Sequence, residues 1–567
     1  MAPDHKRFFA PALACFGLCL LFGWICAQFY LPGKGFTYLI EFGGAQHERF
    51  LPALKAVNHY EISGGTGYDA QYYAQIAMEP DLANPALHRA VDSLPYRARR
   101  ILLSWVAYAL GGGDPVRALQ IFAAENLVCW FALALLFCRW APPWTWSGLV
   151  RWIALLFTFG LCCSVRGALV DGPSLLLIAA AVALAEADRP WLAAATLGIA
   201  GLAKETNLLA GVILLPPWGE SWAFSWRWGS RLYGAEIAGK GRIAGSSPVL
   251  EPGARSPRLR RPWRRAGLLV LAAAPLAAWL LVLHGWLGRA EDLGARNFAL
   301  PFSGYLGKWR EVIAHIQGHG FDLVGRDSLI VLIGLTVQWL AIVLRPRINA
   351  PWWRVGAAYA ALGVVLGPAV WEGYPGATAR VLLPLTAAFV VGIPLGQRRP
   401  REWIILALGA VSILASPSVL NPPGRESVTV HGPRDLRIVP RTGRTVDATF
   451  GPQWYDPEKS WFEYWRWCRG SGTVTFVNPH PFAVTADIHF GLRANDARTV
   501  AVRAPNRTLW MGRLAPAQLR EVQLKSIVLP PGETTWRFET FEPPVRASAA
   551  DARPLTFSLR NLRIDLR

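Results

Sequence analysis

The chain has 567 residues, of which 53% are hydrophobic, and it carries a formal net charge of +20. Apolar stretches of about 20 residues recur along it, the length that an α-helix needs to cross a bilayer, so an ordinary soluble domain is excluded. A nucleic-acid partner is not needed to explain the charge, because much of the positive excess falls in loops between the apolar stretches.

The first apolar stretch, residues 8–30, follows a short basic segment. It is long and has no clear small-x-small cleavage site, so we expect an uncleaved membrane anchor rather than a signal peptide. Seven of the eight cysteines lie in apolar stretches, and none belongs to a CxxC pair. We therefore expect small core residues and neither a metal site nor a disulfide framework.

A polar loop, residues 31–96, follows the anchor and contains SGGTGYDAQYYAQIAMEP at 63–80. Loops of this length without a core of their own are usually functional. Glycines precede Asp69 and helical spacing follows it, so Asp69, Tyr72 and Tyr73 should share one helix face. At this point two interpretations of Asp69 stay open, an N-cap of that helix and a catalytic carboxylate.

Residues 97–112 are short for a membrane span and begin with three arginines, and their assignment decides the topology. Clearer apolar stretches follow at 116–138, 149–165, 168–188, 191–216, 266–287, 328–345, 354–371, 379–397 and 402–418. If 97–112 also crosses, there are about eleven spans, and a cytoplasmic N-terminus places the basic loop 217–265 in the cytoplasm, as the positive-inside rule expects. If 97–112 does not cross, that loop falls outside. We therefore predict a multispan α-helical domain over residues 1–418, whose basic loop either orients the protein or contacts anionic lipid.

Two adjacent charges, Lys204 and Glu205, interrupt the stretch 191–216. Charged groups within a span cost about 2.5 kcal/mol or more each and suggest a function. Adjacent residues point about 100° apart on a helix, so these two cannot pair well with each other. Each needs a partner elsewhere, and Asp171 and Arg166 are the candidates. A structural ion pair between helices is the alternative to a functional role.

Arginines gather at the predicted outer surface, where Arg380 opens one span and Arg97, Arg99 and Arg100 open another. Outward arginines run against the usual charge bias and need a reason. Guanidinium groups pair with phosphate through two hydrogen bonds, so the four could bind an anionic group. Snorkelling to lipid headgroups is the alternative, and it is the favoured one for Arg97, Arg99 and Arg100.

Beyond residue 418 the apolar spacing changes to alternation. Alternating stretches lie at 473–477, 483–493, 498–504, 519–529, 534–540 and 555–567. With Pro, Gly and Asn between them, they predict a small antiparallel β-sandwich over residues 471–567. Residues 419–470 form a linker and an aromatic-rich segment.

The aromatic-rich segment offers candidates for stacking on sugar rings, which are Trp454, Tyr455, Trp461, Tyr464, Trp465 and Trp467. The sandwich would then be a carbohydrate-binding module. The alternative, slightly favoured, is that these aromatic side chains dock the sandwich on the membrane surface or on the membrane domain.

These motifs resemble a known family. GYDAQYYAQIA at 67–77 is similar to the GYDGQFYYQIA-type signature of bacterial multispan proteins in the GT-C superfamily of glycosyltransferases. The resemblance continues in order through PYRARRILLSWVAYAL, DGPSLLLIAAAVALAEADRPWLAAATLGIAGLAKET and ARVLLPL, and it covers most of residues 60–400. One departure is Ala70, where the signature usually has Gly. The segment beginning GPQWYDPEKSW also looks like the entry to the extracytoplasmic β-domain of some such proteins.

The resemblance implies an enzyme of the bacterial cytoplasmic membrane, with the N-terminus inside and the β-domain outside. It would move a sugar from a polyprenyl-phosphate donor to a cell-envelope glycan, glycolipid or protein at the outer face. Asp69 would act as the base in an inverting single displacement. Residues that would bind substrate or the lipid phosphate are Tyr68, Gln71, Tyr72, Arg97, Arg99, Arg100, Arg380, Lys204 and Glu205.

Such a transfer needs a base near the acceptor hydroxyl and positive charge near the departing phosphate. The sequence has no DxD nucleotide-sugar signature. A lipid-phosphate leaving group needs no obligatory metal ion if arginine or lysine neutralises it, although a divalent cation is compatible with the reaction. Two other classes stay open. One is a transporter or flippase of a lipid-linked sugar, with intramembrane charges along its path, although no inverted repeat is evident. The other is a noncatalytic glycan-binding scaffold.

Overall fold

The computed structural model describes residues 5–31, 34–57, 59–62, 66–215, 262–288, 297–372, 377–395, 400–420, 446–456, 458–459, 464–478, 480–546 and 553–566. Most of the basic loop 217–265 and much of the segment 419–470, including Trp461, lie outside these residues. The chain divides into two compact units. One contains residues 1–23, 49–59 and 68–420, and the other contains residues 24–48, 60–67 and 421–567.

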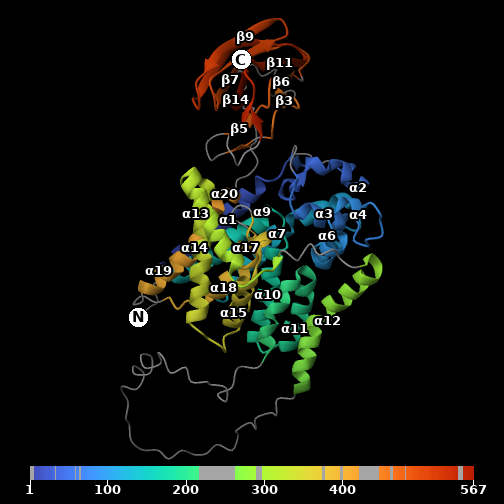
Figure 1. Ribbon diagram of the computed structural model, residues 1–567, viewed down its shortest axis with the longest axis vertical. Coiled ribbons are helices and arrows are strands. Elements are labelled where there is room, and N and C mark those ends of the chain that lie inside the picture. Colours follow the sequence, from blue (N-terminus) through green and yellow to red (C-terminus); the bar gives the residue numbers. More distant parts are fainter. Residues whose placement is uncertain are drawn as a thin grey trace, which may run out of the picture. The chain divides into compact units, whose positions relative to one another are not determined.

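Helices build the first unit (Figure 1). The first half of the chain forms α1 (His5–Ala27), α2 (Pro52–Lys55), α3 (Ala70–Met78), α4 (Leu87–Ala90), α5 (Leu94–Arg97), η3 (Ala98–Arg100), α6 (Leu102–Leu110), α7 (Pro115–Phe137), α8 (Trp146–Leu156), α9 (Phe159–Arg166), α10 (Asp171–Glu186), α11 (Pro190–Ala203), η4 (Glu205–Leu214) and α12 (Pro262–Leu287). Then follow α13 (Ser303–His319), α14 (Leu323–Leu344), α15 (Pro351–Val365), α16 (Pro368–Trp371), α17 (Thr378–Val381), α18 (Leu383–Gly392), α19 (Pro400–Gly409), η8 (Val411–Ala415) and α20 (Ser416–Val419).

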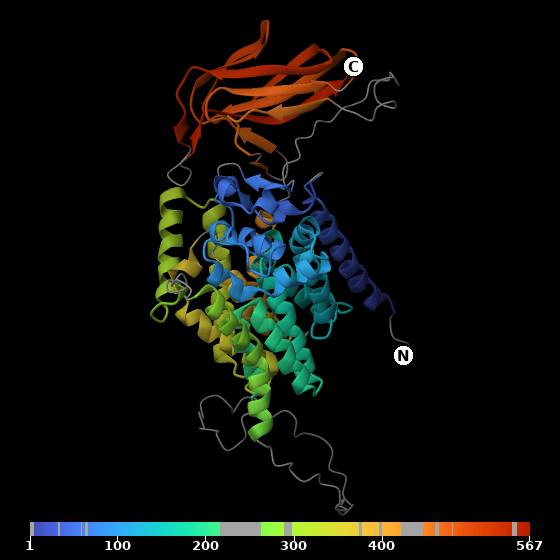
Figure 2. The ribbon, with the colours of Figure 1, turned by 90° about the vertical axis from the view of Figure 1, so that its right-hand side faces the viewer.

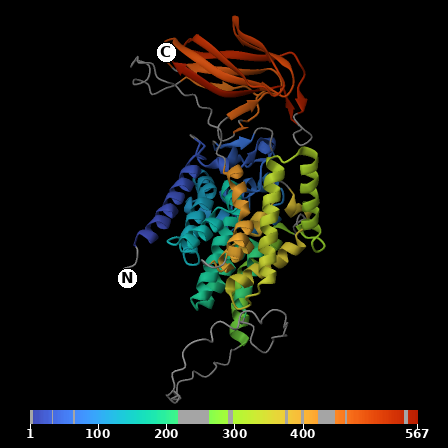
Figure 3. The same cartoon turned by 90° about the vertical axis from the view of Figure 1, so that its left-hand side faces the viewer.

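Neighbouring helices pack closely where small residues allow it. α10, α11 and α12 lie side by side (Figures 1 and 2), as do α13 and α14 (Figure 3). Gly198 permits the contact of α11 with α12, because a Cβ there would lie 2.8 Å from the backbone oxygen of Leu271. Close approach at small residues is typical of helix packing in membranes.

Several helices can cross a membrane. Within the described part of the chain, five are long and apolar enough by length and composition, namely those containing Ala10–Ala27, Pro115–Phe137, Arg265–Leu287, Leu323–Leu344 and Pro400–Val419. The pair α8 and α9, bent by 48°, would make a sixth if it is one span. The prediction of a multispan helical protein is therefore confirmed in this coarser form.

Several of the predicted spans are not single continuous helices, and two of them bear on the charged residues. The stretch 191–216 is broken at Lys204, which has an extended backbone (φ −163°, ψ 130°) between α11 and the 3₁₀-helix η4. In the stretch 97–112, α6 has nine residues, or about 14 Å at 1.5 Å per residue. A hydrocarbon core is about 30 Å thick, so α6 by itself does not cross it.

Strands dominate the second unit. They are β1 (Phe42–Gly43), β2 (Glu61–Ile62), β3 (Asp447–Phe450), β4 (Glu458–Lys459), β5 (Tyr464–Trp467), β6 (Gly472–Asn478), β7 (Val484–Ala494), β8 (Arg498–Ala504), β9 (Arg507–Leu514), β10 (Arg520–Leu529), β11 (Gly532–Thr540), β12 (Val545–Arg546), β13 (Pro554–Leu555) and β14 (Phe557–Leu566). Two antiparallel sheets of five strands have the orders β10-β7-β14-β5-β4 and β3-β6-β11-β8-β9. The shorter strands form a parallel pair, β1 with β2, and an antiparallel pair, β12 with β13.

The alternating stretches of the sequence correspond to β6, β7, β8, β10, β11 and β14, so the prediction of an antiparallel sheet region is confirmed. β6 shows the cause, because every second residue from Gly472 to Asn478 is buried. One hydrophobic core takes residues from both five-stranded sheets, including Phe476 and Trp536 from one and Ile488 and Phe490 from the other.

Candidate functional site

A cavity of about 490 Å³ in the first unit collects most of the charged residues singled out above. Its cations are Arg97, Arg99, Arg100, Lys204 and Arg380, and its carboxylates are Asp69, Asp92, Asp171 and Glu205. Further lining residues come from α3, the α9–α10 connection, α15, α16 and α17. The predicted outer-loop and intramembrane groups therefore belong to one site, with one more cation than carboxylates.

Asp69 immediately precedes α3, but its side chain makes no capping hydrogen bond to that helix. The N-cap interpretation is therefore wrong, because the Asp69 backbone is already helical (φ −51°, ψ −37°) and its carboxylate turns away. Oδ1 instead lies 3.1 Å from Nη1 of Arg97. The side chain is 39% exposed, and within the described residues Oδ2 has no hydrogen-bond partner.

Arg97 is held by a second carboxylate that the sequence analysis did not single out. Nε and Nη2 of Arg97 donate to the two oxygens of Asp92 at 2.9 and 2.6 Å. The guanidinium also lies over the Tyr72 ring, 4.9 Å from its centroid. Burial raises the pKa of Tyr72, so this phenol stays protonated at neutral pH. Arg97 is thus fixed on two sides and orients Asp69.

The break after α11 separates Lys204 from Glu205 and gives each its own partner. Nζ of Lys204 donates to Oδ1 of Asp171 at 2.5 Å, which confirms Asp171 as a partner. Oε2 of Glu205 accepts from Nε of Arg100 at 3.0 Å. This geometry agrees with the interpretation that Lys204 and Glu205 form structural ion pairs between helices. Arg166, the other candidate partner, does not line the cavity.

Arg380 completes the buried charge cluster around Asp171. Its Nη1 donates to Oδ2 of Asp171 at 2.9 Å, and its Nη2 donates to the hydroxyl of Tyr68 at 2.7 Å. Gly160 of α9 allows α17 to take this position, because a Cβ there would lie 2.2 Å from the Ala379 oxygen. The approach of two backbones therefore sets where the Arg380 guanidinium lies.

Arg99 accounts for the one positive charge by which the cations of the cavity outnumber its carboxylates. Among the residues that the structure describes, no carboxylate lies within ion-pair distance of it, and its guanidinium lies 5.6 Å from the Tyr96 ring centroid. Arg100, by contrast, also donates to the hydroxyls of Tyr73 and Tyr96, at 3.0 and 3.4 Å. Arg99 is therefore the arginine of the three that is available to an incoming anion.

Some predicted residues lie outside the cavity lining, and some lining residues were not predicted. Gln71 is buried in α3, and Tyr72 acts through Arg97. The sequence analysis did not select Asp92 or Asn297, whose amide donates to the Tyr96 hydroxyl at 3.3 Å. One sequence feature could have indicated Asp92 as a partner of Arg97, namely its position five residues before this first arginine of PYRARR.

The structure alters the predicted sugar platform of the β region. Trp454 is 4% exposed in the core, where its Nε1 donates to the Thr473 oxygen at 3.0 Å, and Trp467 is 8% exposed. Their ring faces are covered by packing, so both were wrongly assigned to a surface platform. Trp465 is half-buried, and Arg560 lies 4.6 Å from its ring centroid. Arg560 therefore covers part of the Trp465 ring.

Within the described ranges, no group of three or more His, Cys, Asp or Glu side chains could hold a metal ion. A comparison with protein-family models finds no match, and a search of curated proteins finds none either.

Proposed function

We propose that this protein is a membrane glycosyltransferase of the GT-C type that uses a polyprenyl-phosphate sugar as donor. It transfers the sugar to a cell-envelope glycan, glycolipid or protein at the outer face of the bacterial cytoplasmic membrane. The observation that carries the proposal is one cavity that combines a partly exposed carboxylate, Asp69, with the guanidinium of Arg99, which has no carboxylate partner among the described residues. The order of the sequence motifs supports the same class.

The carboxylate is placed for work as a base. Arg97 holds one oxygen of Asp69, and the other is available to an acceptor hydroxyl. In a single displacement the hydroxyl oxygen bonds to the anomeric carbon while its proton passes to Asp69. The bond from that carbon to the phosphate oxygen breaks, and the lipid phosphate leaves with the electron pair. Attack opposite the leaving group inverts the anomeric centre, and no covalent enzyme intermediate is formed.

The charge of the cavity suits a lipid phosphodiester. Four of the five cations face carboxylates in the same cavity, so one positive charge remains. A phosphodiester carries one negative charge, whereas a nucleotide diphosphate carries more and would meet four carboxylates. Arg99 can donate to the departing phosphate through two hydrogen bonds and stabilise the charge that develops on it.

A lipid chain needs an apolar surface beside the cavity. A small pocket lined by aromatic and aliphatic side chains adjoins it along the chain. Trp371 and Leu382 line this pocket, and they directly follow Val370 and Val381 of the cavity lining. This pocket, at about 20 Å³, is too small to enclose a prenyl chain, so the chain would lie against the apolar surface beside it, with its phosphate at the arginines.

The proposed topology has about eleven spans, a cytoplasmic N-terminus, and a β-sandwich formed by the two five-stranded sheets outside the membrane. It requires broken or short helices to serve as spans, and residues 97–112 are critical because α6 covers only nine of them. Protease treatment of sealed, right-side-out vesicles tests it. Digestion of the C-terminal region supports the proposal, and protection there would refute it.

The catalytic proposal is tested with purified protein in lipid, given polyprenyl-phosphate sugars and candidate acceptors. Asp69→Asn should lower the transfer rate about 10²- to 10⁴-fold, the usual contribution of a general base. Asp114→Asn is the matched control, because Asp114 caps α7 outside the cavity and asparagine caps equally well. Transfer by Asp69→Asn at the rate of the control would sink the catalytic role. Movement of the lipid-linked sugar across the bilayer without transfer would instead favour the transporter.

A further inference from the structure

Tyr96 of α5 lies at the centre of the arginine cluster in the cavity that contains Asp69. The guanidinium carbons of Arg97, Arg99 and Arg100 lie 5.6, 5.6 and 5.4 Å from the centroid of its ring. A guanidinium within about 6 Å of an aromatic ring is attracted by the negative potential of the ring face. One aromatic side chain therefore gathers three cations that would otherwise repel one another.

The hydroxyl of Tyr96 accepts two hydrogen bonds. Nη2 of Arg100 donates to it at 3.4 Å, and Nδ2 of Asn297 donates to it at 3.3 Å. A phenolic hydroxyl is a donor as well as an acceptor, and both of these neighbours supply only N–H groups. Among the residues that the structure describes, no acceptor takes the Tyr96 O–H. The proton of this hydroxyl is therefore available to a ligand.

A ligand in the cavity of about 490 Å³ would meet this hydroxyl beside a guanidinium. Tyr96, Asn297 and Arg99 all line this cavity. Of the three arginines around the Tyr96 ring, Arg99 has no carboxylate within ion-pair distance in the described part of the chain. A neutral O–H donor and a cation without a carboxylate partner thus line the same space. Phosphate oxygens accept hydrogen bonds from both kinds of group.

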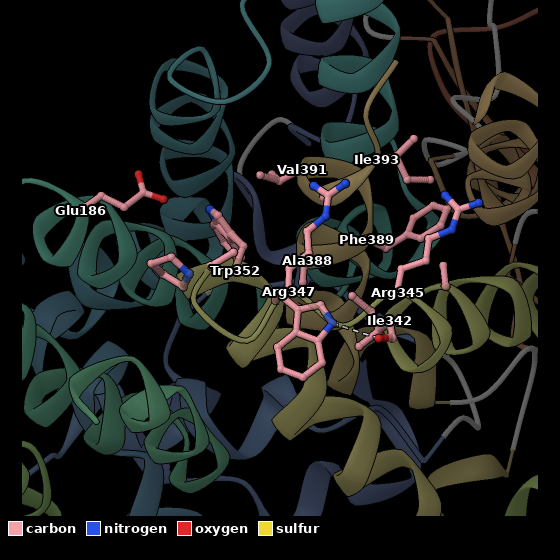
Figure 4. A pocket seen from close by; sticks show the side chains of 14 residues that line it. Glu186, Ile342, Arg345, Arg347, Trp352, Ala388, Phe389, Val391 and Ile393 are labelled. Carbon is pink, nitrogen blue, oxygen red and sulfur yellow. Dashed lines mark hydrogen bonds between the residues drawn. The ribbon is translucent and has the colours of Figure 1, made fainter. Parts of the chain in front are cut away.

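A second pocket with arginines in the first unit lacks this combination. Its volume is about 140 Å³, it lies where α14, α15 and α18 meet (Figure 4), and it shares no lining residue with the larger cavity. No tyrosine is among its described lining residues. Arg345 in this pocket is paired with Glu402, and Glu186 is paired with Arg139. Its exposed Arg347 therefore offers a control for positive charge alone.

We propose that Tyr96 is a phosphate-binding residue of the cavity and acts together with Arg99. Its O–H and the Arg99 guanidinium donate to the phosphate of a prenyl-phosphate lipid, an identity of the ligand that rests on the proposed function. When the bond from the anomeric carbon breaks, the phosphate oxygen keeps the electron pair, and the phosphate passes from one negative charge toward two. The hydroxyl keeps its proton and donates a stronger hydrogen bond to the more negative group.

The experiment measures binding of farnesyl phosphate to the full chain in phosphatidylcholine nanodiscs, with native mass spectrometry counting the bound lipid. Tyr96→Phe removes the hydroxyl and keeps the ring that gathers the arginines. Tyr108→Phe is its matched control, because Tyr108 is an exposed phenol of α6 outside the cavity lining. Arg99→Gln is compared with Arg347→Gln, which removes an arginine elsewhere. Farnesol, which has no phosphate, controls for the apolar chain.

We expect Tyr96→Phe and Arg99→Gln each to weaken binding of farnesyl phosphate about tenfold, the loss of one hydrogen bond to a charged group. Tyr108→Phe and Arg347→Gln should leave the affinity unchanged. Unchanged affinity in Tyr96→Phe overturns the proposal, as does an equal loss for farnesol, since the hydroxyl would then not act on the phosphate. If thermal unfolding shows that Tyr96→Phe does not fold, Arg99→Gln decides, and unchanged affinity in that variant overturns the proposal.

The binding assay contains neither sugar nor acceptor, so it separates the phosphate contact from glycosyl transfer. A loss of affinity in Tyr96→Phe supports the phosphate contact even if the unsubstituted protein transfers no sugar, and only the proposed transfer is then refuted. Transfer by the unsubstituted protein together with unchanged affinity in Tyr96→Phe refutes the phosphate contact alone. Absence of saturable binding of farnesyl phosphate to the unsubstituted protein also overturns the phosphate contact.

Discussion

Replacement of Asp171 by asparagine tests the buried charge cluster most directly. The Asp171 side chain is 3% exposed, and its two oxygens accept from Lys204 at 2.5 Å and from Arg380 at 2.9 Å. Asparagine keeps the size of the side chain but removes its charge. Both cations, each 9% exposed, would then stay buried without a carboxylate.

The cost follows from how many partners each member has. Removing one partner of a buried ion pair costs about 3–5 kcal/mol, and Asp171→Asn leaves two cations uncompensated, so we expect the upper end of that range. Lys204→Met should cost less, about 1.5–3 kcal/mol, because Arg380 still neutralises Asp171. The two substitutions remove one shared interaction, so the double variant should cost less than the sum of the single ones.

Denaturant titration of the purified protein in mixed micelles measures the free energy of unfolding for each variant. Asp188→Asn is the matched control, since Asp188 is exposed just beyond the other end of α10, and it should change that free energy by less than about 0.5 kcal/mol. The reasoning fails if Lys204→Met costs as much as Asp171→Asn. It also fails if the two single costs simply add.

Other predictions follow from single contacts. Arg99→Gln should weaken binding of a polyprenyl-phosphate sugar about tenfold or more, as measured by titration of the donor. It should leave the free energy of unfolding nearly unchanged in denaturant titration. A large loss of stability would contradict the absence of a carboxylate partner of Arg99 among the described residues. Gly160→Ala should lower the free energy of unfolding by about 1–3 kcal/mol, because its Cβ would collide with the backbone of α17. Gly392→Ala is the control, because its Cβ would meet open space and should not destabilise the protein. Equal thermal unfolding of the two variants would refute this packing. Trp454→Ala should cost about 3–5 kcal/mol and expose the β region to protease, whereas Trp465→Ala, at a half-buried position, should leave it resistant. Equal protease sensitivity of the two variants would contradict this difference in burial.

Local patterns predicted much of the fold. Alternation located six of the strands because one face of each is buried, as in β6. It missed β9, an edge strand in which only Leu514 is fully buried, so the chain there shows little contrast between its two faces. The break at Lys204 was also missed, since hydropathy reports the apolar character of 191–216 and not its backbone path.

The site was predictable in its members but not in its pairings. A charge in an apolar stretch shows that a partner exists, and Asp171 was found on that basis. The partner of Glu205 is Arg100, 105 residues away in the sequence, and no local pattern connects them. The prediction that Trp454 lies on a sugar-binding surface was wrong for another reason. An aromatic residue beside a sheet has the same sequence spacing whether its side chain packs inward or faces solvent.

Because of the break between α11 and η4, the order of the two adjacent charged residues, Lys204 and then Glu205, matters to the structure. Hydropathy plots, composition tables and charge counts return the same values for Lys-Glu and for Glu-Lys at positions 204 and 205. The molecule does not treat them alike, because the first position faces Asp171 and the second faces Arg100. An inverted dipeptide would set carboxylate against carboxylate and ammonium against guanidinium. A variant-scoring scheme or a design protocol that considers only composition and local hydropathy would therefore score this exchange as neutral.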